Sequence, residues 1–181
     1  ETNLGDFCAD AYRTVLNADV AFINGGGIRG PIKAGEVTYG DVIDIHPFGN
    51  SMCVVEATGR EIMDALEMAY RTVGEGENGG FLHVSGLSCT IDLSVPSSVV
   101  VDEKEAFVKV AGERRVRDIL INGEPIDPNK IYTVASHDYL LKSGGGGNTL
   151  FTDNRLVKDE VMLDNQVLIT YIRQYLKGII T

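Results

Sequence analysis

The stretch INGGGIRG, residues 23–30, is the strongest constraint on the fold, because it directly follows an apolar run. Residues 19–23 read DVAFI, a pattern typical of a buried strand, and three glycines occupy positions 25–27. Glycine fills no core and costs backbone entropy, so it is useful mainly where the backbone turns sharply or lies close to another group. The sequence therefore predicts a buried strand that runs into a tight turn.

Three longer segments carry apolar side chains at helical spacing. They predict helices over residues 2–17, 60–72 and 164–176, and a short helix opens at 38–43. The stripe of the first helix consists of Leu4, Phe7, Cys8, Ala11, Val15 and Leu16. Thr2 or Asn3 is suited to cap this helix, since both residue types accept hydrogen bonds from the amides of a first turn.

The remaining apolar runs are short and rich in β-branched residues, which predicts strands. These runs cover residues 51–58, 81–87, 89–93, 98–101, 107–110, 116–121 and 131–135, and a hairpin turn is expected at 122–126. Because the helices and strands are mixed rather than strictly alternating, we expect an α+β fold with a mixed β-sheet core. With 181 residues, the chain is long enough for a single domain over 1–181 with one core.

Composition excludes several classes of protein. The net charge of −10 argues against binding of a nucleic acid polymer, which requires a basic face. No apolar run approaches the roughly 20 residues of a membrane span. The chain begins at Glu1 without a basic leader, so we expect a processed chain or an excised domain.

The cysteines and histidines do not follow a metal-site pattern. Cys8, Cys53 and Cys89 are widely spaced, and we interpret them as buried free thiols. The three histidines form no His-x-His or His-Glu-x-x-His motif, so we predict no metal site in this chain.

Two loop segments could present ligand-binding groups. In the glycine turn, Asn24 offers a donor and an acceptor, and Arg29 can form a paired contact with a carboxylate or phosphate. The alternative is a tight turn whose arginine forms a surface ion pair. In HPFGN, residues 46–50, Phe48 either packs over a core edge or is offered to a planar ligand.

A third segment, SHDYLL at 136–141, precedes the glycine loop SGGGGN at 143–148. The Ser-His-Asp string is not a catalytic triad, because adjacent residues on extended backbone point to opposite faces. Tyr139 and Phe48 could instead sandwich a flat ring. Phe81, in the glycine-flanked run GGFLHVSG, is expected in the core, and nothing in the chain is suited to activate a water molecule.

Taken in chain order, these motifs resemble the C-terminal domain of 5′-nucleotidases. The similar segments are ETNLGDFCADAYR, INGGGIRGPIKAGEVTYGDVIDIHPFGN, GGFLHVSG and INGEPIDPNKIYTVASHDYLLKSGGGG, and they cover nearly the whole chain. The resemblance implies an α/β/β/α arrangement of layers and a domain that binds the nucleoside part of a nucleotide. It also implies an N-terminal metallophosphoesterase domain in cis, absent from this chain, that holds two divalent metal ions and is joined through a hinge helix. The whole enzyme would be extracellular, periplasmic or attached to the cell wall.

The resemblance also assigns residues. It implies that Phe48 and Tyr139 stack on the two faces of the base, that Asn24 contacts the base, and that Arg29 binds polar groups near the ribose or phosphate. The implied substrate-binding set is Asn24, Arg29, Phe48, Asn50, Tyr139, Gly144, Gly145 and Gly146.

One position departs from the family pattern. The family's second loop reads GGDG, and its Asp holds the ribose hydroxyls, whereas this chain has Gly146 there. Asn148 or Asp138 would have to substitute for that carboxylate. The alternative function is therefore a nucleoside-binding or interaction module without catalysis.

Overall fold

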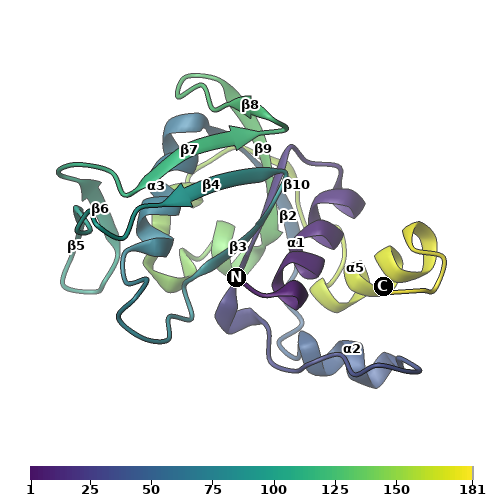
Figure 1. Ribbon diagram of the computed structural model, residues 1–181. Coiled ribbons are helices and arrows are strands. Elements are labelled where there is room, and N and C mark those ends of the chain that lie inside the picture. Colours follow the sequence, from purple (N-terminus) through teal and green to yellow (C-terminus); the bar gives the residue numbers. More distant parts are fainter. Residues whose placement is uncertain (181) are drawn as a thin grey trace.

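The computed structural model describes residues 1–180, and its centre is a five-stranded mixed sheet (Figure 1). The strand order is β10-β2-β9-β1-β3. The strands are β1 (Val20–Asn24), β2 (Met52–Thr58), β3 (Leu82–Ser85), β9 (Ile131–His137) and β10 (Leu156–Lys158). β1 and β9 run parallel, while β1 with β3, β2 with β9 and β10 with β2 are antiparallel.

Two smaller sheets accompany the central one. β4 (Leu87–Ile91), β7 (Val116–Ile121) and β8 (Glu124–Pro125) form a three-stranded antiparallel sheet in the order β4-β7-β8. β5 (Val99–Val101) and β6 (Phe107–Val110) pair as a two-stranded ribbon, which projects at the left of Figure 1.

Side chains of the central sheet alternate between two cores, as the period of a strand requires. In β1, Val20 and Phe22 join a core with α3 (Gly59–Tyr70) and residues of β7. Ala21 and Ile23 join the opposite core, which is closed by α1 (Asn3–Leu16), α2 (Tyr39–Ile45) and α5 (Asp164–Thr170). Both faces of the central sheet are therefore covered, and β1 and β2 are almost entirely buried.

The helices begin at side-chain caps that satisfy amides of their first turn. Thr2 accepts a hydrogen bond from the amide of Gly5, so it is the cap of α1. Thr58 forms a reciprocal capping box with Glu61 at the start of α3, and α2 begins with the same arrangement. The short helix α4 (Asp138–Leu141) is capped by the ring nitrogen Nδ1 of His137, which accepts from the amide of Leu140 at 3.3 Å.

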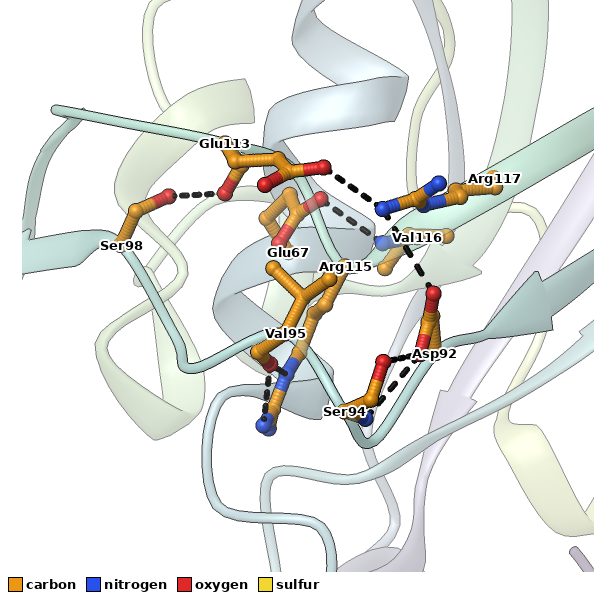
Figure 2. Close-up of polar contacts among 9 residues, drawn as sticks. All are labelled: Glu67, Asp92, Ser94, Val95, Ser98, Glu113, Arg115, Val116 and Arg117. Carbon is orange, nitrogen blue, oxygen red and sulfur yellow. Dashed lines mark hydrogen bonds and ion pairs between the residues drawn. The ribbon is translucent and has the colours of Figure 1, made fainter.

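A buried arginine joins α3 to the turn between β4 and β5 (Figure 2). The guanidinium of Arg115, a residue that is 6% exposed, donates twice to the carbonyl of Val95, at 3.1 and 2.9 Å. It also donates to the carbonyls of Tyr70 and Arg71 at the carboxyl end of α3. Next to it, a carboxylate oxygen of the fully buried Glu67 accepts from the amide of Val116. These bonds hold the end of α3, from which the chain continues into the glycine loop 74–80.

The α+β class with a mixed sheet and covering helices is confirmed, but several boundaries differ from the prediction. The helix expected over 164–176 is regular only as far as Thr170 and continues as a π-helical turn over Tyr171–Tyr175. The strand expected over 131–135 extends to His137. The predicted thiols are free, with Cys8 and Cys53 buried and Cys89 half-buried, and Phe81 packs only partly buried against the core of α3.

Candidate functional site

Four loops meet at one end of the central sheet. The glycine turn follows β1, and the segment with Tyr139 follows the parallel strand β9. The loop with Phe48 precedes β2, whose first residue Met52 pairs with His137, and the loop 74–81 precedes β3, whose Leu82 pairs with Asn24. The strand register alone therefore brings together segments that are far apart in the sequence.

The glycine turn is held by backbone hydrogen bonds to the loop 74–81. The amide of Gly25 donates to the carbonyl of Phe81 at 2.7 Å, and the amide of Gly26 donates to that of Gly79 at 2.9 Å. The side chain of Asn24 donates to the same Gly79 carbonyl at 3.0 Å. A Cβ atom at position 26 would lie 3.2 Å from the carbonyl oxygen of Gly79, and one at position 27 would lie 3.1 Å from Oδ1 of Asn24, so both positions are tight, whereas position 25 has ordinary room.

The two polar residues of the glycine turn differ in exposure. Arg29 is exposed, and only its backbone amide is engaged, with the carbonyl of Ile45 at 3.0 Å. Asn24 is 6% exposed, and its oxygen Oδ1 is buried without a hydrogen-bond partner among residues 1–180. Arg29 is therefore able to approach a ligand from solvent, whereas Asn24 also holds the loop 74–81 in place.

The loop before β2 presents an exposed aromatic ring. Phe48 is 60% exposed, so it is not part of either core. Two residues later, Asn50 donates from its backbone amide and its side chain to Oδ2 of Asp164, at 3.2 and 3.1 Å. Asp164 is the first residue of α5, so α5 supports the carboxyl end of the Phe48 loop.

Tyr139 provides the second exposed ring. It lies in α4, is 46% exposed, and its ring packs against Gly145 in the loop 143–148. In that loop, Gly144 is buried, whereas Gly146 is exposed and has a φ of 68°. The nearest atom to a Cβ added at position 146 would be the Cα of Gly80. The structure thus places both predicted aromatics at the same end of the sheet, because Phe48 lies in the loop that enters β2 and Tyr139 lies in α4, which follows the adjacent strand β9.

Of the two residues considered as substitutes for the missing carboxylate, Asn148 is directed away from this end. It is 3% exposed and donates to the carbonyl of Ala65 in α3 at 3.2 Å. Asp138 is half-buried, and its Oδ1 accepts from the amide of Tyr139. Asp138 is therefore the remaining carboxylate beside the ring of Tyr139.

Sequence reasoning missed a buried polar cluster beneath the glycine turn, formed by Tyr12, His46 and His137. The rings of His46 and His137 lie 5.8 and 6.3 Å from that of Tyr12, and both histidines are 1% exposed. Burial lowers the pKa of His46, and it lowers the pKa of His137 to about 4. Both rings are neutral near pH 7. The signal for this cluster was weak, because a tyrosine on a helix and two separate histidines match no motif.

The Ser-His-Asp string is engaged in separate contacts. Ser136 donates to the carbonyl of Phe22 at 2.7 Å, while His137 caps α4. Within residues 1–180, no group of three or more His, Cys, Asp or Glu side chains is placed to hold a metal ion. Among the helices of the same residues, none combines the length and apolarity that crossing a membrane requires.

A large cavity, about 1130 Å³, begins at Pro31, just after the glycine turn, but Asn24, Arg29, Phe48 and Tyr139 do not line it. It is lined by the start of α1, the segment 31–39, the end of α5 and the residues near 178–180. The volume of this cavity is not sufficient reason to identify it as the functional site. The two exposed rings and the arginine lie together at the end of the sheet, where hydrogen bonds join the glycine turn to the loop 74–81.

The fold and this cluster define an α+β domain that presents two aromatic rings and an arginine at one end of a mixed sheet. The chain belongs to the 5′-nucleotidase C-terminal domain family, whose sequence profile matches residues 1–153.

Individual relatives agree with this assignment. The chain is 32% identical to the trifunctional nucleotide phosphoesterase protein YfkN of Bacillus subtilis, over an alignment that covers 96% of this chain and 11% of that protein. It is 31% identical to a 5′-nucleotidase of Vibrio parahaemolyticus, over 88% of this chain and 26% of that protein. A crystal structure of a 5′-nucleotidase precursor from Thermus thermophilus superposes with a TM-score of 0.80 at 29% identity, over 97% of this chain and 33% of that one. The chain thus spans a third or less of the length of these relatives.

Proposed function

We propose that this chain is the substrate-binding domain of a 5′-nucleotidase-type phosphohydrolase and that it holds the nucleoside part of a nucleotide. The observation that carries the proposal is the pair of exposed rings, Phe48 before β2 and Tyr139 after the adjacent strand β9, at one end of the sheet. Apolar aromatic surface that is left exposed on neighbouring loops is a common feature of ligand sites. A base between the two rings requires ring planes about 7 Å apart, since each stacking contact takes about 3.4 Å.

Each residue of the cluster has a distinct role in this proposal. The two rings stack on the base, which contributes on the order of 1–3 kcal/mol for each face. Arg29 supplies positive charge to the ribose or phosphate side, in a chain whose net charge is −10. Asn24 contacts the base, Asn50 supports the Phe48 ring through its bonds to Asp164, and the backbone of Gly144, Gly145 and Gly146 lies beside the sugar.

The chemical step is proposed to take place on an N-terminal metallophosphoesterase domain in cis. Two divalent metal ions bound there would supply the activated water for phosphoester hydrolysis. The contribution of this chain is to bind and orient the substrate. The whole protein is proposed to act outside the cytoplasm, in the extracellular space, in the periplasm or at the cell wall.

A titration tests this proposal. Adenosine and AMP are added to the isolated 181-residue chain while backbone amide shifts are recorded by NMR. We expect saturable shifts at residues 24–29, 48–50 and 139–146, with upfield movement of the base protons from ring stacking. We also expect no hydrolysis of AMP, UDP-glucose or a cyclic nucleotide by this chain with added Mn²⁺ or Zn²⁺. Shifts confined to the segment 31–39 and residues 178–180, or no binding, would contradict the proposed site.

A second candidate function is a non-catalytic interaction module. The observation in its favour is the cavity beside the segment 31–39, around which Val37, Tyr39 and Ile179 are exposed. The length of the natural gene product separates the two candidates, because a metallophosphoesterase domain encoded upstream favours the hydrolase.

A further inference from the structure

His46 connects the two loops that carry Arg29 and Phe48. It ends α2, stands two residues before Phe48, and is 1% exposed. Its ring nitrogen Nδ1 lies 3.0 Å from the carbonyl oxygen of Gly27, in the glycine turn. Its other nitrogen, Nε2, lies 3.2 Å from the hydroxyl of Tyr12 on α1.

The partners of His46 determine where its proton lies. A carbonyl oxygen can only accept, so Nδ1 carries the proton and donates to Gly27. Burial lowers the pKa of His46, which keeps the ring neutral near pH 7 and leaves Nε2 with a lone pair. Burial also raises the pKa of Tyr12, so its hydroxyl keeps its proton and donates to Nε2. One nitrogen therefore faces the glycine turn, and the other faces the core.

A backbone bond reinforces the same connection. The amide of Arg29 donates to the carbonyl of Ile45 at 3.0 Å, beside the bond from His46 to Gly27. Adjacent residues at the end of α2 thus hold the turn at two points, one of them at the backbone of Arg29 itself. On its other side, the Phe48 loop is held through Asn50 and Asp164.

We propose that His46 is a positioning residue for ligand binding: its Nδ1–H bond to Gly27 holds the Arg29 turn and the Phe48 loop in one fixed relation. The proposal rests on the proposed function in one respect, namely that Arg29 and Phe48 contact the same ligand. A hydrogen bond to a buried acceptor is suited to this role, because breaking it leaves an unpaired carbonyl.

Two substitutions of His46 test separately the role of Nδ1, which faces the glycine turn, and the role of Nε2, which faces the core. His46→Asn places an amide N–H near the position of Nδ1, while His46→Gln places its amide near the position of Nε2. Tyr12→Phe removes only the bond on the core side and keeps the shape. AMP affinity by calorimetry and stability by urea denaturation are measured for all three variants.

We expect His46→Gln to weaken AMP binding about tenfold, which corresponds to the loss of one hydrogen bond. His46→Asn should stay within about threefold of the natural chain and Tyr12→Phe within about twofold, although each is less stable. Affinities that follow the stability losses in all three variants would overturn the proposal, and so would natural affinity in His46→Gln.

A measurement without ligand separates this inference from the proposed function. Hydrogen exchange at the amide of Arg29 reports its bond to Ile45, and we expect exchange in His46→Gln to be about tenfold faster than in His46→Asn. If the natural chain binds no nucleoside, the proposed function fails, and this exchange difference still decides whether His46 joins the loops. Equal exchange in the two variants would refute that role.

The natural chain supplies a test that does not depend on the folding of any variant. Long-range nitrogen-proton NMR spectra of the histidine rings distinguish the two neutral tautomers. We expect Nδ1 of His46 to be protonated and Nε2 unprotonated at about pH 7. The opposite tautomer would exclude the bond to Gly27 and overturn the proposal.

Discussion

The ring of Tyr139 lies directly against Gly145, so that a side chain at position 145 would collide with the ring. The position of one proposed stacking residue thus depends on a glycine six residues further along the chain. Gly145→Ala should move the ring and weaken AMP binding about tenfold, measured by calorimetry. Gly40→Ala is the control, because the methyl group has room in α2. Natural affinity in Gly145→Ala would show that the ring position is unimportant.

Removal of either ring tests the stacking directly. Phe48→Ala and Tyr139→Ala should each lose on the order of 1–3 kcal/mol of adenosine affinity, because each removes one stacked face. Tyr175→Ala is a matched control, since Tyr175 is 49% exposed, lies in the turn after α5 and packs its ring beside that of Tyr171. Calorimetry measures the affinity of each variant. A loss in Tyr175→Ala equal to that in the other two would contradict a specific stacking role.

Position 146 tests how the sugar is recognised. Gly146 is exposed at a φ of 68°, a conformation that Asp tolerates better than most residues. Gly146→Asp introduces the carboxylate that the resemblance implies at this position, so we expect the preference for adenosine over 2′-deoxyadenosine to rise about tenfold, at a stability loss of about 1 kcal/mol. Gly146→Asn is the matched control, with the same shape and no charge. An unchanged preference in Gly146→Asp would place the sugar elsewhere.

Two arginines near β7 allow a matched test of buried charge (Figure 2). Arg115→Met leaves three carbonyls without their donor and should lower the free energy of unfolding by about 3 kcal/mol. Arg117 is half-exposed, and its ion pairs with Asp92 and Glu113 are at the surface, so Arg117→Met should change the same quantity by less than about 1 kcal/mol. We expect one cooperative transition in urea for both variants. Equal losses would contradict the role of Arg115.

His137 makes stability depend on pH. Its pKa is lowered from 6.5 to about 4, so the unfolded chain binds the proton first as the pH falls. The stabilising contribution is complete above about pH 6.5 and is lost as the pH falls towards 4, with a total of about 3 kcal/mol. His137→Asn keeps a cap for α4 but does not titrate.

Urea denaturation at about pH 7 and about pH 4.5 checks this prediction. The natural chain should lose about 2 kcal/mol more than His137→Asn between the two conditions. The pKa values of Asp6 and Asp164 are raised, chiefly by burial, and act in the opposite sense, but they cancel in the comparison of the two chains. Equal losses would show that His137 is not buried as a neutral ring.

Most of the fold was predictable from hydrophobic periodicity. The stripe from Leu4 to Leu16 predicted α1 to within one residue at each end, because that face packs against β1 and β3. β10 was missed because all three of its residues are exposed, so its sequence lacks the alternation of buried and exposed residues that is typical of a strand. α4 was missed because its cap is the ring of His137, a residue type outside the usual set of helix caps.

The site was predictable in part. The strand register brings the predicted loops to one end of the sheet, yet the roles of their residues stay predictions. What the sequence could not reveal is the set of contacts beneath the loops. The bond from His46 to Gly27 joins residues 19 positions apart, and no local pattern signals it.

The parallel pairing of β1 with β9 has a consequence for how the chain folds. Ser136 donates to the carbonyl of Phe22, a contact that spans 114 positions. Closing so long a loop is entropically unfavourable until many other contacts support it, so such pairs form late. This strand pair brings the Arg29 turn and the Tyr139 segment to the same end of the sheet. During refolding, nucleotide binding should therefore appear later than helical structure. The rate at which binding appears would then report the rate of the last step of folding.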